Sequence, residues 1–239
     1  MFKGKRVLGL IPARGGSKRL PRKNVLPFNG KPLIAWTIQA GLDSMYLDRL
    51  VVSTEDQEIR ETSVKFRPCC VIKRPKELAS DTASSVDVAL HALDYFSNRG
   101  EMFNYLALMQ PTSPLRKSKH IDEAFALMGE KDARAIIGVC ETEHPVSWMG
   151  KIPPTFSMDE FIENRHLAKD TRRQEKPDYQ INGSIYLIEV SELRRGQTFF
   201  PAHSAYAYIM DREISVDIDT YMQFLLAEHL HEKLSTTDS

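Results

Sequence analysis

The stretch "RVLGLIPARGGSKRLPRKN", residues 6–24, joins a short apolar run to a basic loop that contains glycine. The run at 6–11 is rich in branched aliphatic side chains and stops at Pro12, which is typical of a buried strand in a parallel sheet. From Gly9 to Asn24 the chain holds five Lys or Arg and no acidic residue. Such a sequence cannot form a core, and ligands of α/β sheets bind at the carboxyl ends of strands. We therefore interpret the loop as a ligand-binding element.

Strand and helix patterns alternate along the first 140 residues. Short strand-like runs occur at 6–11, 49–54, 69–72, 105–110 and 133–140, and helical patterns lie between them at 31–44, 57–66, 84–96 and 119–128. This alternation with short connections predicts an α/β fold, with a mostly parallel sheet and helices on both faces.

The alternation fails between residues 141 and 178, which are rich in Pro and charge. The segment is too long for a plain loop in a compact domain, so we expect an excursion, either a lid or an arm that reaches another subunit. Regular structure resumes at 183–190 and 204–210, and an amphipathic helix from Tyr221 precedes a polar tail. The expected organisation is one domain from 1–140 and 179–234, a dimerisation excursion at 141–178, and a disordered tail at 235–239.

The composition favours an ordinary globular protein of 239 residues. Lys plus Arg and Asp plus Glu both number 32, so no net charge favours nucleic acid or a membrane surface as a partner. The three cysteines show no metal-site spacing, the first 16 residues lack the long apolar region typical of a signal peptide, and no 18-residue apolar run occurs in the sequence. We expect a cytoplasmic protein without disulfides or zinc.

The basic loop has the chemistry of a polyphosphate cradle. Gly15 and Gly16 can adopt positive φ and let backbone N–H groups approach a ligand, while five cationic side chains surround them: Arg14, Lys18, Arg19, Arg22 and Lys23. Neither G-x-x-x-x-G-K-[ST] nor G-x-G-x-x-G is present. Composition alone leaves a solvated basic turn as the alternative.

The segment "IPARGGSKRLPRKN" closely resembles the first signature of the sialic acid cytidylyltransferases, the CMP-nonulosonate synthetases. Five later segments resemble that family's signatures in the same order, at 74–85, 110–116, 172–174, 182–187 and 215–220. The resemblance implies a Rossmann-like nucleotidyltransferase domain and a homodimer. It also implies a reaction in which CTP is joined to the anomeric hydroxyl of a nine-carbon acidic sugar with release of pyrophosphate.

On the nucleotide side, the resemblance implies two groups of residues. The triphosphate would be held by the basic loop, through Arg14, Gly15, Gly16, Ser17, Lys23 and Asn24. The cytosine would be read by Arg74, Ala83 and Ser85. An alternative for the second group is a plain helix start, because Asp81, Thr82 and Ser84 are all good N-caps before an apolar run, and both descriptions can hold together.

On the sugar side, the resemblance implies contacts from Gln110, Asn182, Tyr186, Phe199 and Phe200. Core packing is the alternative for the aromatic residues, and a structural role is the alternative for Arg116. Arg173, with Arg172 as the second choice, would reach the sugar carboxylate of the neighbouring subunit, and a solvated charge run is the alternative there.

The chain departs from the family pattern in the sugar half of the site. Ser147 stands where some members carry Lys, with Lys151 as a substitute, and Gln180 stands where many carry Arg. These departures leave the sugar less defined than the nucleotide. An N-acylneuraminate type of sugar is the first expectation, legionaminic acid is next, and pseudaminic acid and Kdo rank lower.

The segment "SVDIDT", 215–220, predicts a magnesium site. In an extended segment Asp217 and Asp219 project to one side, and two adjacent carboxylates repel unless a cation lies between them. Mg²⁺ binds a few carboxylates together with phosphate oxygens and water. Capping of the next helix would explain Asp219 or Thr220 but not Asp217. We expect Arg14, Lys23, Asp217 and Asp219 to carry catalysis, whereas a non-catalytic nucleotide-binding regulator would not need the second carboxylate.

Overall fold

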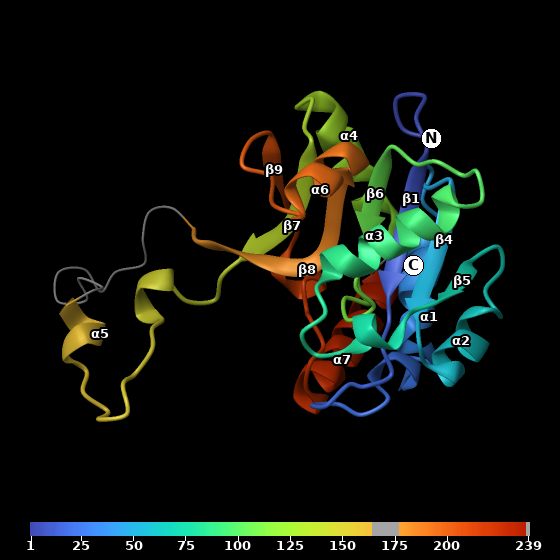
Figure 1. Cartoon of the computed structure of the whole chain (residues 1–239). Helices are drawn as coiled ribbons and strands as arrows, with labels where there is room; N and C mark the ends of the chain where they lie inside the picture. Colours follow the sequence, from blue (N-terminus) through green and yellow to red (C-terminus); the bar gives the residue numbers. More distant parts are fainter. Residues whose placement is uncertain (164–176, 238–239) are drawn as a thin grey trace.

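The computed structural model describes residues 1–163 and 177–237, which form a rounded α/β body with one projecting arm (Figure 1). A seven-stranded sheet crosses the body in the order β5-β4-β1-β6-β8-β7-β9. The strands are β1 (Val7–Pro12), β4 (Arg49–Thr54), β5 (Cys70–Lys73), β6 (Tyr105–Leu108), β7 (Ala135–Glu141), β8 (Tyr179–Glu189) and β9 (Ala205–Ile209).

The predicted mostly parallel sheet is confirmed. Only β8 is antiparallel to its neighbours β6 and β7, and the other adjacent pairs in this sheet are parallel. β8 returns along β7 from the arm without a crossover helix, and such a direct return favours antiparallel pairing.

Helices cover both faces of the sheet, as the alternating pattern predicts. α1 (Leu33–Leu42), α2 (Gln57–Ser63) and α4 (Ser118–Glu130) pack on one face, and α3 (Ser85–Ser97) and α6 (Val190–Gly196) on the other. β1 shows why both faces need cover: Val7 and Ile11 belong to the first core, whereas Leu8 and Leu10 belong to the second. The sequence reading did not anticipate α6.

A third, smaller core positions the loops at the carboxyl ends of the strands. It contains Leu20 of the basic loop, Leu115 of the loop after β6, Ile218, and Phe224 of the last helix, α7 (Tyr221–Thr237). The short hairpin of β2 (Pro27–Phe28) and β3 (Lys31–Pro32) contributes Phe28, whose ring packs edge-on against Phe224 at 5.5 Å. Three segments distant in the sequence are therefore held against one helix.

The remaining elements are short. They are the 3₁₀ turns η1 (Lys23–Val25), η2 (Lys76–Ala79), η3 (Val146–Trp148) and η4 (Arg212–Ile214), and the helix α5 (Asp159–Glu163). α7 continues through Thr237, so its last turn occupies part of the tail expected to be disordered. Among the described residues, no helix is long and apolar enough to cross a membrane. The three cysteines are free.

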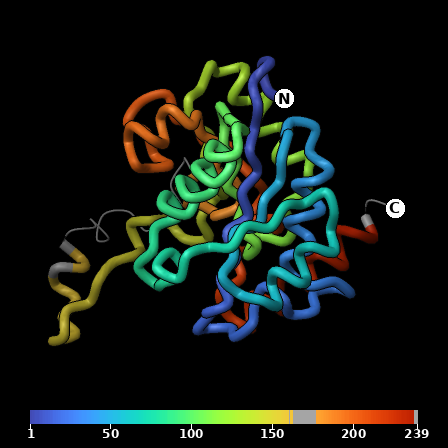
Figure 2. The backbone as a smooth tube through the Cα atoms, turned by 45° about the vertical axis from the view of Figure 1, so that its right-hand side comes forward, coloured from blue at the N-terminus to red at the C-terminus, as the bar shows by residue number. Residues whose placement is uncertain are grey.

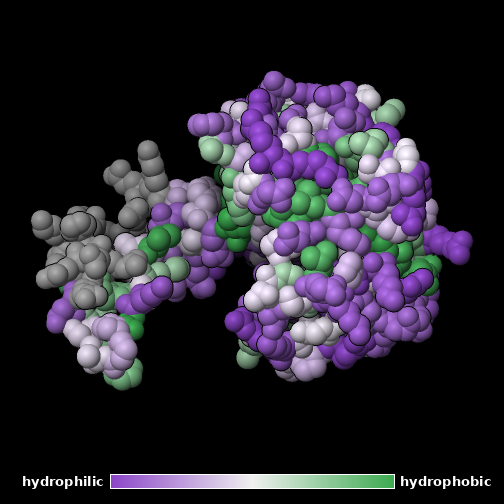
Figure 3. Space-filling model, in the orientation of Figure 1, coloured by the Kyte–Doolittle hydropathy of each residue, from purple (hydrophilic) through white to green (hydrophobic). Residues whose placement is uncertain are grey.

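The arm is the connection between Glu141, where β7 ends, and Tyr179, where β8 begins. Two views show it projecting away from the body (Figures 1 and 2). At its base the N–H of Thr142 donates to the carbonyl of Asp178 at 2.9 Å. Its described part carries apolar side chains on its surface (Figure 3). The Phe156 side chain is 82% exposed.

Candidate active site

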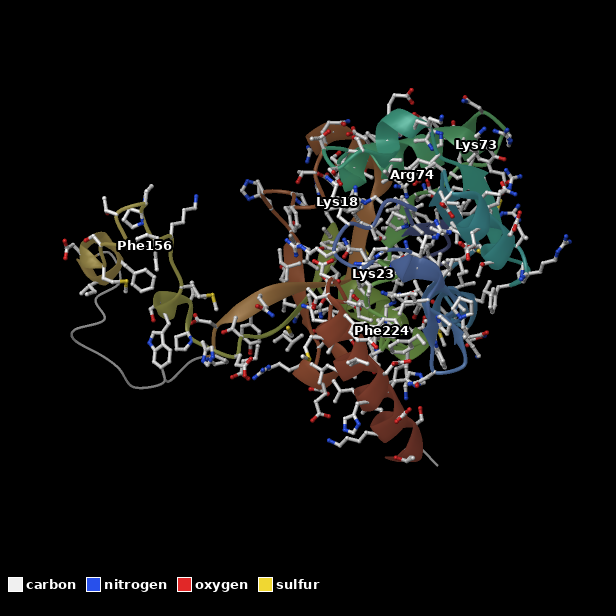
Figure 4. The ribbon with its side chains drawn as sticks, turned by 90° about the horizontal axis from the view of Figure 1, so that it is seen from below. Lys18, Lys23, Lys73, Arg74, Phe156 and Phe224 are labelled. Atoms are coloured by element: carbon white, nitrogen blue, oxygen red, sulfur yellow. The ribbon has the colours of Figure 1, made fainter. Side chains whose placement is uncertain are left out.

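A polar pocket of about 570 Å³ opens at the carboxyl ends of β1 and β6. Its walls come from the basic loop, the segment before α3, the loop after β6, and the segment before α7. Ten sequence-predicted residues line it: Arg14, Ser17, Lys23, Asn24, Arg74, Ala83, Ser85, Gln110, Asp217 and Asp219. Figure 4 shows Lys18, Lys23 and Arg74 on the body, well separated from Phe156 on the arm. The topology thus brings four distant segments of the chain to one opening.

The cations of the basic loop are paired with acids from other parts of the chain. Arg22 donates to both carboxylate oxygens of Asp56, at 2.6 and 3.1 Å, and also to Glu58. This ion pair lowers the pKa of Asp56 below its usual range, with the Arg22 hydrogen bond as the largest cause. Arg22 therefore fastens the loop to the start of α2 and does not line the pocket.

Asp81 holds two other cations of the loop at the mouth of the pocket. Its carboxylate accepts from Nη1 of Arg14 at 2.7 Å and forms a second ion pair with Lys18. Hydrogen bonds from Lys18 and Arg14 lower its pKa. Asp81 also lines the pocket. Its carboxylate therefore occupies the position beside Arg14 and Lys18 where these two cations could instead neutralise a phosphate group.

The two loop glycines act differently from the prediction. Neither Gly15 nor Gly16 has positive φ, and neither lines the pocket. A Cβ on Gly15 would lie 2.5 Å from a carboxylate oxygen of Asp56, and its N–H donates to Glu55 at 2.7 Å. Glycine is therefore needed at position 15, because any side chain there would collide with Asp56. The left-handed conformation occurs instead at Arg22, with φ of 61°.

Lys23 and Asn24 are buried, which their sequence did not indicate. The ammonium group of Lys23 donates to the carbonyl of Ile218 and, at 3.0 Å, to Asp219. The amide of Asn24 donates to the carbonyl of Arg14 at 3.0 Å. Lys23 therefore ties the basic loop to the carboxylate segment, and Asn24 fixes the backbone that carries Arg14.

The predicted cytosine segment surrounds the start of α3. Ser84 is the N-cap and accepts from the N–H of Asp87 at 3.1 Å, so the helix-start description holds. Arg74 is 4% exposed and donates to the carbonyl and the hydroxyl of Ser53 at 2.6 and 3.3 Å. Burial lowers its pKa to about 10. Arg74, Ala83 and Ser85 line one wall of the pocket.

Asp217 and Asp219 share the pocket but differ in environment. Burial, chiefly, and the charge of Asp219 raise the pKa of Asp217 above its usual value, and a hydrogen bond with Thr112 opposes this. Oδ1 of Asp217 is buried without a hydrogen-bond partner. Asp219 is about half exposed and pairs with Lys23 at 3.0 Å and Arg19 at 3.4 Å.

This geometry corrects one part of the metal argument. The repulsion between the two carboxylates is partly offset within the protein, because Lys23 and Arg19, from a loop about 200 residues away in sequence, both contact Asp219. Across residues 1–163 and 177–237, no group of three or more His, Cys, Asp or Glu side chains forms a metal cage. Two carboxylates, one with an orphaned buried oxygen, fit a cation whose remaining ligands are phosphate and water oxygens.

Gly183 is a site residue that the sequence reading named only as part of a motif. It has φ of 71°, and a Cβ there would lie 2.6 Å from Oε1 of Gln110 and 3.7 Å from Oδ2 of Asp217. The β7–β8 register shifts at this point, where Ile137 pairs with Tyr186 but Val139 with Ile181. The bulge carries the backbone of Gly183 toward the pocket floor. The Asn-Gly pair was the available signal for this left-handed turn.

The predicted sugar residues do not all meet. Gln110 lines the pocket, but Asn182 is buried in the core, where its amide donates to the Ser215 hydroxyl at 3.0 Å and the Met210 sulfur at 3.2 Å. The ring of Tyr186 packs with Phe199 and Phe200 at 5.8 and 6.1 Å. Asp217 contributes to the raised pKa of Tyr186, after burial, so this aromatic cluster is beside the pocket without lining it. Arg172 and Arg173 lie outside the described residues.

Arg116 has the structural role that was left open for it. It is 1% exposed and donates to the carbonyls of Gln110 at 3.2 Å and Ser184 at 2.7 Å, and to the hydroxyl of Thr37 at 2.6 Å. It thereby joins the loop after β6 to β8 beneath the pocket. The sequence reading missed Thr112 as a pocket residue, named Lys18 only among the cations of the basic loop, and considered Asp81 only as a helix cap.

Comparison with known proteins places the chain in a family. The sequence model described as Cytidylyltransferase matches residues 8–234, which is nearly the whole chain. The chain belongs to the cytidylyltransferase family. This cytidylyltransferase is 31% identical over 229 residues to the CMP-N,N'-diacetyllegionaminic acid synthase of Legionella pneumophila, a match that covers 95% of this chain and 97% of that protein. It is 36% identical over 220 residues to the N-acylneuraminate cytidylyltransferase of Streptococcus agalactiae, covering 90% of this chain and 51% of that protein.

A solved structure agrees on the fold. The CMP:2-keto-3-deoxy-manno-octonic acid synthetase complexed with CTP superposes with a TM-score of 0.70 at 14% identity, over 95% of this chain and 99% of that one. The predicted Rossmann-like fold is thereby confirmed. The family model and the two relatives show that the protein is a nucleotidyltransferase.

Proposed function

We propose that this cytidylyltransferase transfers CMP from CTP to the anomeric hydroxyl of a nine-carbon acidic sugar of the N-acylneuraminate type, with release of pyrophosphate. The observation that carries the proposal is one pocket that combines the basic loop, the start of α3 and the Asp217–Asp219 segment. A cationic loop suits a triphosphate, and a helix start offers N–H donors to a base.

The triphosphate would lie along the basic loop, with Arg14 and Lys18 released from Asp81 to neutralise it. Lys23 is held by Asp219 and the carbonyl of Ile218, so it would approach the α-phosphate region from a fixed position. A fixed cation needs no reorganisation when charge develops on the transferring phosphorus, which is how preorganised groups lower barriers. Arg74, Ala83 and Ser85 would contact the cytosine.

Asp217 is the residue we assign to the reacting end of the substrates. Its buried location and raised pKa favour a carboxylate that accepts a proton from the attacking sugar hydroxyl or binds a cation. Asp217 and Asp219 would hold Mg²⁺, which when bound supplies Lewis-acid polarisation of the phosphate oxygens. Gln110, placed by Gly183 and Arg116, would orient the sugar hydroxyls.

The sugar remains the less defined substrate. The two relatives described above are named for legionaminic and N-acylneuraminic acids, and the sequence departs from the sialic pattern at Ser147 and Gln180. Legionaminic acid is therefore the second candidate, ahead of pseudaminic acid and Kdo. Tyr186, Phe199 and Phe200 form the aromatic cluster that an N-acyl group would contact.

The arm would complete the site in a homodimer. Of its residues, Val146, Trp148, Met149, Ile152, Phe156 and Ile162 each expose more than two fifths of their surface. Several large apolar side chains exposed on one short segment are typical of an association site. Arg173 belongs to the same connection, and we retain it as the cation for the carboxylate of the neighbouring subunit's sugar. The arm at 141–178 is accordingly a dimerisation unit inserted between 1–140 and 179–234.

The direct test is pyrophosphate release with Mg²⁺ and a panel of acidic sugars, each with CTP, UTP, ATP or GTP. We expect turnover with CTP and one nine-carbon acid at least tenfold above the other combinations. Equal rates with a purine triphosphate would refute the assignment of the α3 start to cytosine. CTP binding without turnover on any acid of the panel would favour the nucleotide-binding regulator.

A hybrid experiment tests the shared site. Arg173→Ala should weaken sugar binding while CTP binding is kept, and Arg14→Ala should do the reverse. Mixed subunits of the two variants contain one site with both arginines, so activity should partly return. No recovery after demonstrated subunit exchange would place Arg173 outside the site.

A further inference from the structure

A second cavity, of about 250 Å³, lies on the body between α1, the start of α4 and the end of α7. It shares no lining residue with the pocket described above. One wall carries the rings of Trp36 and His231, whose centroids are 4.1 Å apart, together with the apolar side chains of Ala40, Leu115 and Leu234. Such a wall suits a flat apolar group.

The orientation of His231 leaves a donor for a ligand. Its Nδ1 lies 3.1 Å from the amide nitrogen of Asn29, which also donates to the carbonyl of Glu228 at 3.0 Å. Since an amide NH₂ can only donate, Nδ1 is the acceptor and the ring proton is on Nε2. The indole N–H of Trp36 is already used, because it donates to the carbonyl of Phe28 at 2.9 Å.

The side of the cavity at the start of α4 is cationic, and the lining also contains one carboxylate, Asp43, which accepts from the Gln39 amide at 2.8 Å. α4 begins here with a lysine, Lys117, at the N-cap, and no acidic residue lies in its first turn. Lys31 lies over the Trp36 ring of the first wall at 4.7 Å, although it does not line the cavity. A lysine side chain has no acceptor, so it cannot cap the helix N–H groups, and the helix dipole adds to its charge.

A buried cation in the cavity wall also favours an anionic ligand. Arg116 lines the cavity and is 1% exposed, and its Nε is buried without a hydrogen-bond partner. Its guanidinium contacts only carbonyl and hydroxyl oxygens. Burial lowers its pKa to about 9, with no carboxylate to offset this. A buried cation without a counter-charge is costly, and an anion in the adjacent cavity would reduce that cost.

We propose that this cavity binds a small anion that carries one planar ring, with the ring against Trp36 and His231 and the carboxylate or phosphate at Lys117 and the start of α4. Two elements connect the second cavity to the active pocket. The first is the loop after β6: Pro111 and Thr112 line the active pocket, and Pro114–Lys117 line the second cavity. α7 follows Asp219 at one end and supplies His231 and Leu234 at the other. Occupancy of the second cavity therefore changes CTP affinity, and by linkage CTP changes the affinity of the second ligand.

Phenyl phosphate is the probe, and Trp36 is the reporter. The chain has two tryptophans, so a Trp148→Phe background leaves Trp36 as the fluorophore. We expect a saturable change in Trp36 fluorescence with a Kd of roughly 0.1–1 mM, the range of small ligands with about ten heavy atoms. Inorganic phosphate, which lacks the ring, and benzamide, which lacks the charge, should each bind at least tenfold more weakly.

Lys117→Glu and Lys119→Glu form a matched pair, because both residues are exposed and neighbouring but only Lys117 lines the cavity. Lys117→Glu should weaken phenyl phosphate binding at least tenfold, and Lys119→Glu by less than twofold. Arg14→Ala should leave binding unchanged. No saturable signal, equal losses in the lysine pair, or a loss in Arg14→Ala would each overturn the proposal, the last because the probe would then occupy the active pocket.

Linkage is measured separately. The Kd for CTP should change by about fivefold or more when phenyl phosphate is saturating, and this change should vanish in Lys117→Glu. An unchanged Kd for CTP with the second cavity demonstrably occupied would overturn the coupling. These measurements follow binding, so they remain informative whichever acidic sugar the enzyme uses.

Discussion

Gly183 lies so close to Gln110 that a single added carbon would be 2.6 Å from the side-chain oxygen of Gln110. The contact joins the bulge of β8 to the loop after β6, and Asp217 lies within 3.7 Å of the same point. One backbone position therefore sets the places of a candidate sugar ligand and a candidate catalytic carboxylate.

Gly183→Ala should reduce kcat/KM at least tenfold, because Gln110 must move to admit the methyl group. Gly30→Ala is the matched control: Gly30 also has positive φ, at 81°, but a Cβ there meets nothing within 4 Å. Both variants should lose about 1–2 kcal/mol of stability from left-handed strain in a non-glycine residue. Steady-state kinetics and urea unfolding separate the effects, and equal kinetic losses in both variants would show that strain alone is responsible.

Asp81→Asn should strengthen CTP binding about threefold to tenfold. The carboxylate competes with substrate phosphates for Arg14 and Lys18, so removing its charge leaves both cations available. Asp94→Asn is the control, because it removes an exposed ion pair with Arg194 outside the pocket. Calorimetric titration with CTP measures the change. Weaker binding by Asp81→Asn would mean that Asp81 holds Arg14 in its working position.

Much of this arrangement could be read from the sequence, and the failures have physical causes. The strands and helices to Glu141 follow from local apolar periodicity, and the pocket residues follow from short motifs at strand ends. Ion pairs such as Lys23 with Asp219 span about 200 residues, so no local pattern records them. The sequence explains Gly15 by the positive φ that glycine can adopt, whereas in the structure a side chain at this position would collide with Asp56, which comes from the end of another strand. Asn182 was assigned to the sugar by motif, whereas the β8 bulge turns its side chain into the core.

Asp217→Asn should lower kcat about 100-fold or more while the protein remains at least as stable. The substitution keeps the size of the side chain and removes the charge of a buried carboxylate with an unpartnered oxygen. Asp219→Asn is the informative comparison, because it breaks the contact with Lys23 and should lower both activity and stability. Activity at several Mg²⁺ concentrations and thermal unfolding provide the measurements. Normal turnover of Asp217→Asn at low Mg²⁺ would leave both residues as structural.

Arg22→Gln should destabilise the protein by about 1 kcal/mol at pH 7. The pKa of Asp56 is lowered in the folded state, so its stabilising contribution is complete above its ordinary value of 3.8 and is lost as pH falls through the lower folded value. The difference between wild type and Arg22→Gln should therefore shrink below about pH 4. Urea unfolding from pH 7 to pH 3 tests this, and a difference independent of pH would exclude the Asp56 ion pair as its source.

Phe156→Asp should convert the proposed dimer to monomers. Phe156 is 82% exposed on the arm, and an apolar side chain exposed to this extent in a run of others is stabilised by burial against a partner. Its φ is 58°, a conformation that aspartate tolerates better than phenylalanine, so the arm itself should not be strained by the change.

Met45→Asp is the control, because Met45 is 72% exposed but lies on the body. Sedimentation over a range of concentrations should give a weakened association for Phe156→Asp alone, accompanied by loss of activity if the arm completes the neighbouring site. A wild type that remains monomeric at high concentration, or a Phe156→Asp variant that associates as tightly as Met45→Asp, would show that the arm has another role.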